Sequence, residues 1–193
     1  MEDSEAIKLI KQGEREQFRV LVERHQAMVF RTCMGFLHNQ HDAEDLTQEV
    51  FIKAYQSIDS FKGDSAFSTW IYRIAVNASL NKVRANSKNF LFQKLDTLLG
   101  SGKNYEPSVV FHESENPEDM LVKEEHRLWV QKALDSLPEN QRTAIVLSKY
   151  DELSQKEIAE IMNTTEGAVE SLIQRAKTNL REKLFAHLKK NKK

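Results

Sequence analysis

Apolar residues recur every three to four positions along most of this chain, which is the spacing of one face of an α-helix. The spacing predicts a first long helix from Phe18 to about residue 37. A second is expected to begin near Asp42, whose side chain suits a helix cap, and a third to run from about Ser68 to Arg84. No segment alternates apolar and polar residues between turn residues, so the sequence predicts an all-α fold.

The second half of the chain shows the same spacing after an interruption. Residues 100–107 are rich in glycine and polar side chains and are typical of a flexible linker. Pro117 and Pro138 each predict a helix start, because proline suits the first helical turn. We therefore expect two small helical domains, over 1–87 and 117–193, joined by an acidic linker over 88–116. The apolar residues between Phe90 and Leu99 are compatible with one short amphipathic helix inside that linker.

Residues 154–177 carry the clearest local motif. Ser154 and Glu157 have the spacing of a capping box, and Asn163 to Thr165 favour a turn after a short helix. The pattern predicts a helix-turn-helix, whose second helix can enter a DNA major groove. An ordinary helical hairpin with a solvated outer face would show the same pattern. The residues expected on the outer face are Glu166, Glu170, Ser171, Gln174, Arg175 and Thr178.

Composition and charge narrow the function. The chain has 193 residues, of which 40% are hydrophobic and 30% charged, as is ordinary for a globular protein, and no apolar run has the length of a membrane span. A net charge of −1 hides eight basic residues against one acid from Ser171 to Lys193, and seven acids against one base from Glu106 to Glu125. Clustered positive charge suggests contact with a polyanion, although the terminal lysines alone are typical of a solvated tail.

Features of an enzyme are missing from the sequence. There is no glycine-rich phosphate loop and no nucleophile motif, and the pair His38 and His41, which we expect to be exposed, has no further ligands beside it. The single Cys33 is expected to be a small buried residue, and a chain without a possible internal disulfide is typical of a reducing cytoplasm. We expect no catalysis, no cofactor and no metal.

Four motifs in one order resemble the extracytoplasmic-function sigma factors, the two-domain members of the bacterial sigma-70 family. They are DAEDLTQEVFIKAY at 42–55, FSTWIYRIAVN at 67–77, LPENQR at 137–142, and the helix-turn-helix. The resemblance covers the chain from about Phe18 to Leu184 except for the linker. It implies a cytoplasmic specificity subunit that binds core RNA polymerase at the β′ clamp helices and the β flap, recognises promoter DNA, and is held by an anti-sigma factor.

The resemblance assigns a role to an acidic stripe in the first motif. Asp45 and Glu49 lie four positions apart and share one helix face with Gln48. A solvated face is the ordinary interpretation of such a stripe. The resemblance instead implies that Asp45, Gln48 and Glu49 contact the clamp helices of the polymerase.

Aromatic and basic residues around Gly63 suit single-stranded DNA, because bases stack on rings while cations follow phosphates. Most of these rings could instead belong to a hydrophobic core, and for Phe67 and Trp70 the core is the favoured interpretation. The resemblance implies that this loop and the helix after it melt the −10 element and hold a flipped base. It assigns that contact to Lys62, Gly63, Asp64, Ser65, Ala66, Arg73, Asn77, Asn81, Lys82 and Arg84.

The helix-turn-helix is implied to dock in the major groove of the −35 element through Glu170, Ser171, Gln174, Arg175 and Thr178. Arg175 matches a basic position that the family often uses. Glu170 departs from the family, in which many members carry Arg or Lys there. This departure weakens DNA binding on one side or moves selectivity toward a cytosine amino group.

Two alternatives stay open at this point. A stand-alone helix-turn-helix repressor or activator would explain the C-terminal motif but not the acidic stripe or the aromatic loop. The resemblance implies that the linker passes near the RNA exit path of the polymerase, where we expect Glu113 and Glu115 to mimic RNA phosphates; the alternative is that they only solubilise the linker. For Glu118 and Asp119 the favoured role is to stabilise the N-terminus of the helix that begins near Pro117.

Overall fold

The computed structural model describes residues 1–98 and 127–190, with side chains described up to Lys88 and again from Arg127 to Ala186. The described residues form helices joined by short turns, with no strand among them, and the predicted all-α fold with two helical units is confirmed. Within these residues no helix is both long and apolar enough to cross a bilayer. Glu113, Glu115, Glu118 and Asp119, for which the sequence suggested roles, lie outside the described residues.

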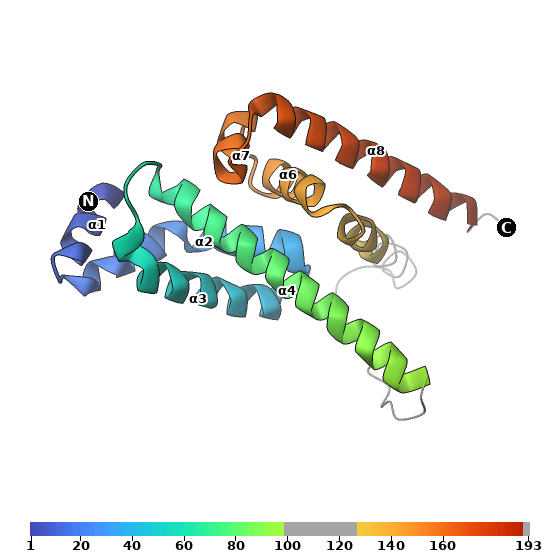
Figure 1. Cartoon of the computed structure of the whole chain (residues 1–193), viewed down its shortest axis with the longest axis horizontal. Coiled ribbons are helices and arrows are strands. Elements are labelled where there is room, and N and C mark those ends of the chain that lie inside the picture. The colour runs from blue at the N-terminus through green and yellow to red at the C-terminus, as the bar shows by residue number, and fades with distance from the viewer. Residues whose placement is uncertain (99–126, 191–193) are drawn as a thin grey trace, which may run out of the picture.

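The first unit, which we call the N-terminal bundle, consists of four helices and two short 3-10 turns (Figure 1). The helices are α1 (Asp3–Lys11), α2 (Phe18–Leu37), α3 (Gln40–Ser57) and α4 (Phe67–Leu98), and the turns are Arg15–Gln17 and Ile58–Ser60. Helices α2, α3 and α4 pack against one another around a core that includes Leu21, Val29, Val50 and Ile71. Cys33 belongs to this core and is fully buried, as predicted.

The second unit, which we call the C-terminal unit, comprises a helical stretch at 127–135 followed by α6 (Glu139–Tyr150), α7 (Gln155–Met162) and α8 (Glu166–Lys190). Ser154 and Glu157 form the predicted capping box, with the Ser154 amide 2.9 Å from Glu157 Oε2 and the Glu157 amide 3.3 Å from Ser154 Oγ. Asn163 ends α7 in the left-handed region with φ 52°. The predicted helix-turn-helix is therefore confirmed.

Helix boundaries differ from the sequence prediction at three places. Helix α1 was not predicted, although it buries Ala6, Ile7 and Ile10. Helix α3 is capped by Asn39, whose Oδ1 accepts the Asp42 amide at 2.9 Å, so Asp42 lies inside the helix and is not its cap. Helix α4 continues to Leu98, through residue 88 where the linker was expected to begin. No glycine or proline lies between Asn86 and Leu98 to end it.

Two side chains lie elsewhere than their local pattern predicted. The His38 side chain is only 8% exposed and was wrongly expected to be open to solvent, whereas His41 is 84% exposed as expected. His38 ends α2 with φ 57° and places Nε2 3.3 Å from Asp135 Oδ1. Tyr150 continues the apolar spacing of α6 toward its inner face, but its side chain is 41% exposed. Contacts between the two units decide the position of His38, and a local pattern does not record them.

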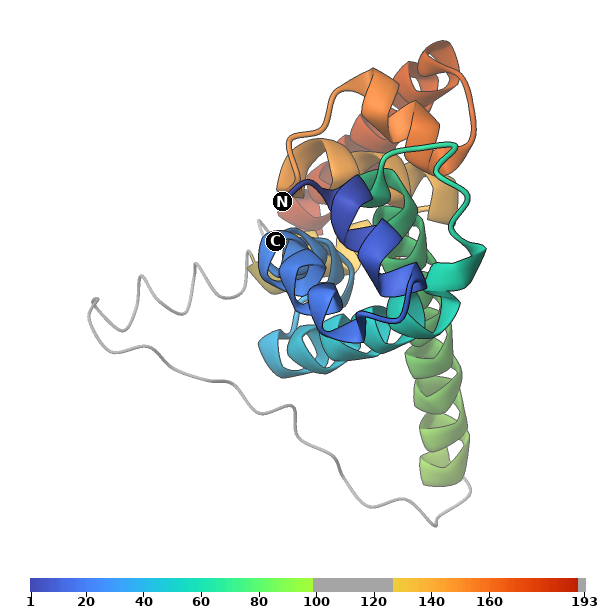
Figure 2. The same ribbon diagram turned by 90° about the vertical axis from the view of Figure 1, so that its left-hand side faces the viewer.

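The two units pack directly on each other. Helix α2 contacts α6, and α4 contacts α7; Figures 1 and 2 show the C-terminal unit lying against α2 and α4. The hydrophobic core of the C-terminal unit includes Phe36, Tyr72 and Val76 from the N-terminal bundle, packed with residues such as Ile145 and Ile158. Each unit therefore covers apolar surface of the other, an arrangement that the sequence pattern did not predict.

Candidate functional site

Helix α3 presents an exposed stripe that consists of Asp45, Gln48, Glu49 and Ile52. Spacings of three, four and seven residues place these side chains on one helix face, while Leu46 and Val50 bury the other face. The sequence analysis did not single out Ile52, which is 57% exposed. Ile52 lies seven positions after Asp45 and so on the same helix face, and this spacing was the signal that could have identified it. A stripe with two carboxylates and one bare apolar side chain suits a partner that has both basic and apolar groups.

The loop between Phe61 and Phe67 exposes most of the residues assigned to −10 contacts. Lys62, Gly63, Asp64 and Ala66 are exposed, and Ser65 is half-buried. Gly63 has φ +81°, a backbone conformation that suits glycine. Buried Phe61 and Phe67 anchor the two ends of the loop, with ring centroids 6.0 Å apart. The loop is thus an exposed segment whose two ends are anchored by buried aromatic side chains.

The aromatic residues near this loop belong mainly to the core. Phe61, Phe67 and Tyr72 are buried, and burial raises the pKa of the Tyr72 hydroxyl. Trp70 is half-buried, and its ring centroid lies 5.3 Å from that of Phe61 and 5.6 Å from that of Phe67. The interpretation of these rings as stacking platforms for bases is therefore corrected, while the expected core role of Phe67 is confirmed.

Helix α4 brings four of the assigned polar residues onto one face. Arg73, Asn77, Asn81 and Arg84 follow one another at intervals of four, four and three residues. Lys82 lies nine positions after Arg73, and nine steps of about 100° turn its side chain about half-way round the helix from Arg73. The structure therefore does not bring Lys82 together with the other four.

Both arginines of this face bind groups of the C-terminal unit. Arg73 donates through Nη2 to the Glu160 main-chain oxygen at 2.6 Å and through Nε to that of Ile161 at 3.3 Å. Arg84 donates to both carboxylate oxygens of Glu139, at 2.5 and 2.6 Å. This ion pair raises the pKa of Arg84 and lowers that of Glu139. Asn77 and Asn81 are exposed, and Asn81 Oδ1 accepts from Arg84 at 3.0 Å.

Helix α8 exposes the whole set assigned to −35 contacts. Its inner face buries Val169, Ile173 and Ala176 against α6 and α7. The side chains assigned to the groove share the opposite, exposed face. They are Glu170, Ser171, Gln174, Arg175 and Thr178. A long helix with a polar, partly basic outer face has the shape that a DNA major groove admits.

Comparison with known proteins gives two family matches. The family model described as Sigma-70 region 2 matches residues 21–89, and the one described as Sigma-70, region 4 matches residues 127–180. The first match covers the α3 stripe, the loop and the polar face of α4. The second contains the helix-turn-helix.

Curated relatives match almost the whole chain. It is 38% identical over 182 residues to the ECF RNA polymerase sigma-E factor of Escherichia coli K12, a match that covers 94% of each protein. It is 36% identical over 178 residues to the ECF RNA polymerase sigma factor SigW of Bacillus subtilis, covering 92% of this chain and 94% of that one.

Solved structures share the fold. CnrH in complex with the cytosolic domain of CnrY superposes with a TM-score of 0.63 at 23% identity, covering 95% of this chain and 97% of that chain. RpoE in complex with the anti-sigma factor NepR from Bartonella quintana gives 0.58 at 24% identity, covering 88% and 97%. At these identities the likeness concerns the fold alone.

Proposed function

We propose the roles of three surfaces from one premise: this chain belongs to the ECF sigma factors of bacterial RNA polymerase. It is a transcription initiation factor that directs RNA polymerase to promoters. The observation that carries this conclusion is the match to ECF sigma factors over 94% of the chain. The three surfaces are the α3 stripe, the loop with the polar face of α4, and the outer face of α8.

The α3 stripe is the proposed contact with the polymerase. Asp45, Gln48 and Glu49 are exposed on a helix whose other face is committed to the core, so they are free to bind a partner. Ile52 extends the stripe and would bury its apolar side chain in that contact. The partner surface we propose is the pair of clamp helices in the β′ subunit, and the C-terminal unit is proposed to bind the β flap.

The −10 element is proposed to bind at the loop 62–66 and the polar face of α4. The exposed loop would receive a base from the non-template strand. Asn77 and Asn81 can donate to and accept from a base, whereas Arg73 and Arg84 would bind phosphates once released from the C-terminal unit. Lys82 would contact phosphates from a different side of the helix.

The −35 element is proposed to bind along α8. Arg175 can donate two hydrogen bonds to a guanine edge, and Gln174 can pair with adenine. Glu170 is an acceptor, which favours a cytosine amino group and repels phosphates. We further propose that the protein works in the cytoplasm, that an anti-sigma factor holds it there, and that it performs no covalent chemistry itself.

Binding to core RNA polymerase separates this proposal from a stand-alone repressor or activator, which has no use for the α3 stripe. The purified chain is mixed with bacterial core polymerase and passed over a size-exclusion column. A sigma factor elutes with the polymerase at one copy per enzyme. A chain that binds DNA through α8 but never elutes with core polymerase would instead be a stand-alone regulator.

A further inference from the structure

Gly35 of α2 marks a very close approach between the N-terminal bundle and the C-terminal unit. A Cβ atom at Gly35 would lie 2.7 Å from Val146 Cγ1 and 3.2 Å from Tyr150 Cγ, both on α6. Two non-bonded carbon atoms cannot lie 2.7 Å apart, so one of them would have to shift. Within α2 alone a glycine is unfavourable, because it weakens a helix relative to alanine. The three atoms nearest to such a Cβ all belong to α6, so the contact with α6 accounts for Gly35.

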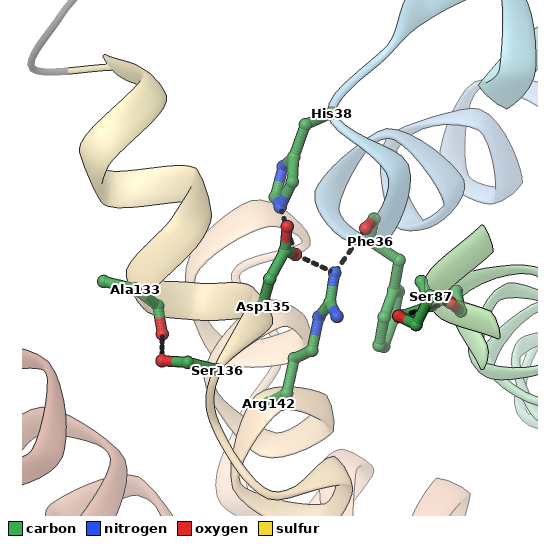
Figure 3. Close-up of polar contacts among 8 residues, drawn as sticks. Phe36, His38, Ser87, Ala133, Asp135, Ser136 and Arg142 are labelled. Atoms are coloured by element: carbon green, nitrogen blue, oxygen red, sulfur yellow. Dashed lines mark hydrogen bonds and ion pairs between the residues drawn. The ribbon is translucent and has the colours of Figure 1, made fainter. Parts of the chain in front are cut away.

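One end of α6 completes the C-terminal turn of α2. Arg142 is 2% exposed and donates through Nη2 to the Phe36 main-chain oxygen and, at 2.6 Å, to Asp135 Oδ1 (Figure 3). The Phe36 oxygen lies in the last turn of α2, where main-chain oxygens have no partner inside the helix. Its partner comes from the other unit, so separation of the units leaves the Phe36 oxygen to water, while Arg142 keeps Asp135 of its own unit.

The other end of α6 makes a second buried polar contact with α2. The Asp151 side chain is fully buried, and its Oδ2 accepts from Thr32 Oγ1 at 2.8 Å. Arg31 Nε lies 3.6 Å from Asp151 Oδ1. The two ends of α6 thus hold α2 at Phe36 and at Thr32, on either side of Gly35. An exposed ion pair such as Arg84 with Glu139 adds little to this, because water and salt screen it.

This packing occupies the proposed DNA contacts. Arg73 and Arg84 bind the C-terminal unit, as described above, and Arg73 also lines a polar cleft of about 630 Å³. In that cleft Asp64 and Ser65 of the loop face Asn163 to Glu166 at the turn of the helix-turn-helix. The surface assigned to the −10 element therefore lies against the turn of the helix-turn-helix in the free chain, next to the start of the helix that carries the −35 residues.

We propose that the contact of Gly35 with Val146 and Tyr150 is an autoinhibitory latch, which keeps the free chain closed with Arg73 and Arg84 bound to its own C-terminal unit. Binding to polymerase or promoter then requires the latch to open. The closed state itself rests on the contacts above, while the identity of the masked ligand rests on the proposed function.

The test compares the shape of the full-length chain with that of Gly35→Ala by small-angle X-ray scattering. Gly167→Ala is the matched control, since it makes the same change in helix α8, where a Cβ atom meets nothing within 4 Å. Two units that have separated are wider than one compact body, so Gly35→Ala should raise the radius of gyration by roughly 5 Å. Gly167→Ala should leave it unchanged. The double variant Gly35→Ala with Val146→Ala removes the clashing methyl group and should close again.

Helix content by circular dichroism shows whether each variant is folded. If Gly35→Ala loses its helices, Thr32→Val takes its place, because it keeps the side-chain shape but removes the hydroxyl that Asp151 binds; it should open the chain in the same way. A wild-type chain that is already extended, or folded variants as compact as wild type, would overturn the latch.

Affinity for core polymerase is measured on the same proteins and gives a separate outcome. If only the open form binds, the apparent affinity for core polymerase falls in proportion to the fraction of molecules that are open. An open Gly35→Ala chain should therefore bind core polymerase about threefold to tenfold more tightly than wild type. If scattering shows opening but neither protein binds core polymerase, the proposed function fails and the latch stands. If both bind equally and scattering is unchanged, the latch fails and the function stands.

Discussion

Arg73 of α4 donates to the main-chain oxygen of Glu160 across 2.6 Å, on the last turn of the first helix of the helix-turn-helix. The oxygens at a helix C-terminus carry partial negative charge and attract a cation. Arg73 thereby commits Nε and Nη2, two of its three donating nitrogens, to main-chain oxygens of α7 and not to a DNA phosphate. The free chain therefore holds a cation of the proposed −10 surface on the unit that is proposed to read the −35 element.

Glu139→Gln should release Arg84 for DNA. The neutral amide keeps the size of Glu139 but removes the charge that binds Arg84 at 2.5 and 2.6 Å. The free chain should then bind promoter DNA more tightly, and its salt slope should steepen by about one, as one more phosphate is neutralised. Affinity is measured by fluorescence anisotropy over a range of salt. Glu5→Gln on distant α1 is the control, and an unchanged slope in Glu139→Gln would contradict the assignment of Arg84.

Glu49→Lys should weaken binding to core polymerase about tenfold or more, which corresponds to about 1.4 kcal/mol. Glu49 is exposed, so its stability cost should stay within about 0.5 kcal/mol. Glu5→Lys makes the same change at an exposed position of α1, outside the stripe, and it serves as the control. Equal polymerase affinity of the Glu49→Lys and Glu5→Lys chains, both folded, would remove the stripe from the contact.

Local patterns predicted the elements well and the interface poorly. The capping box at Ser154, the core position of Phe67 and the inner face of α8 follow from short spacings within one helix, and the structure shows them all. Helix α4 runs beyond its prediction, because helix length depends on where a breaker stands and none stands there. The burial of His38 and Arg142 arises from residues about a hundred positions apart, which no periodicity records.

Arg175→Ala and Glu170→Arg should change −35 binding in different ways. Arg175→Ala should cost about 1–3 kcal/mol on the preferred sequence if its side chain reaches a guanine. Glu170→Arg replaces a repulsive charge by an attractive one near the phosphates, so general DNA affinity should rise and selectivity should fall. Both are measured by competition among −35 variants. Undiminished selectivity in the Glu170→Arg chain would show that Glu170 does not read a base.

Because of Asp151, the free energy of unfolding should fall as the pH rises through the acidic range. Burial raises the pKa of this carboxyl above its ordinary 3.8, and the hydrogen bond from Thr32 opposes the rise. Between the ordinary and the raised pKa the native chain holds more protons than the unfolded chain, so the contribution is present below this window and lost above it. Asp151→Asn should flatten that part of the profile, measured by denaturant midpoints, whereas exposed Asp59→Asn should not. A slope that persists in Asp151→Asn would assign it to another group.

Start-site mapping with purified components tests the central claim, that this chain directs RNA polymerase to promoters. Core polymerase is incubated with genomic DNA with and without the chain, and the 5′ ends of all transcripts are sequenced. The claim predicts a set of start sites that appears only with the chain, shares one −35 and one −10 sequence, and weakens in Glu49→Lys. The same start sites with and without the chain, or no transcripts that depend on it, would contradict the claim.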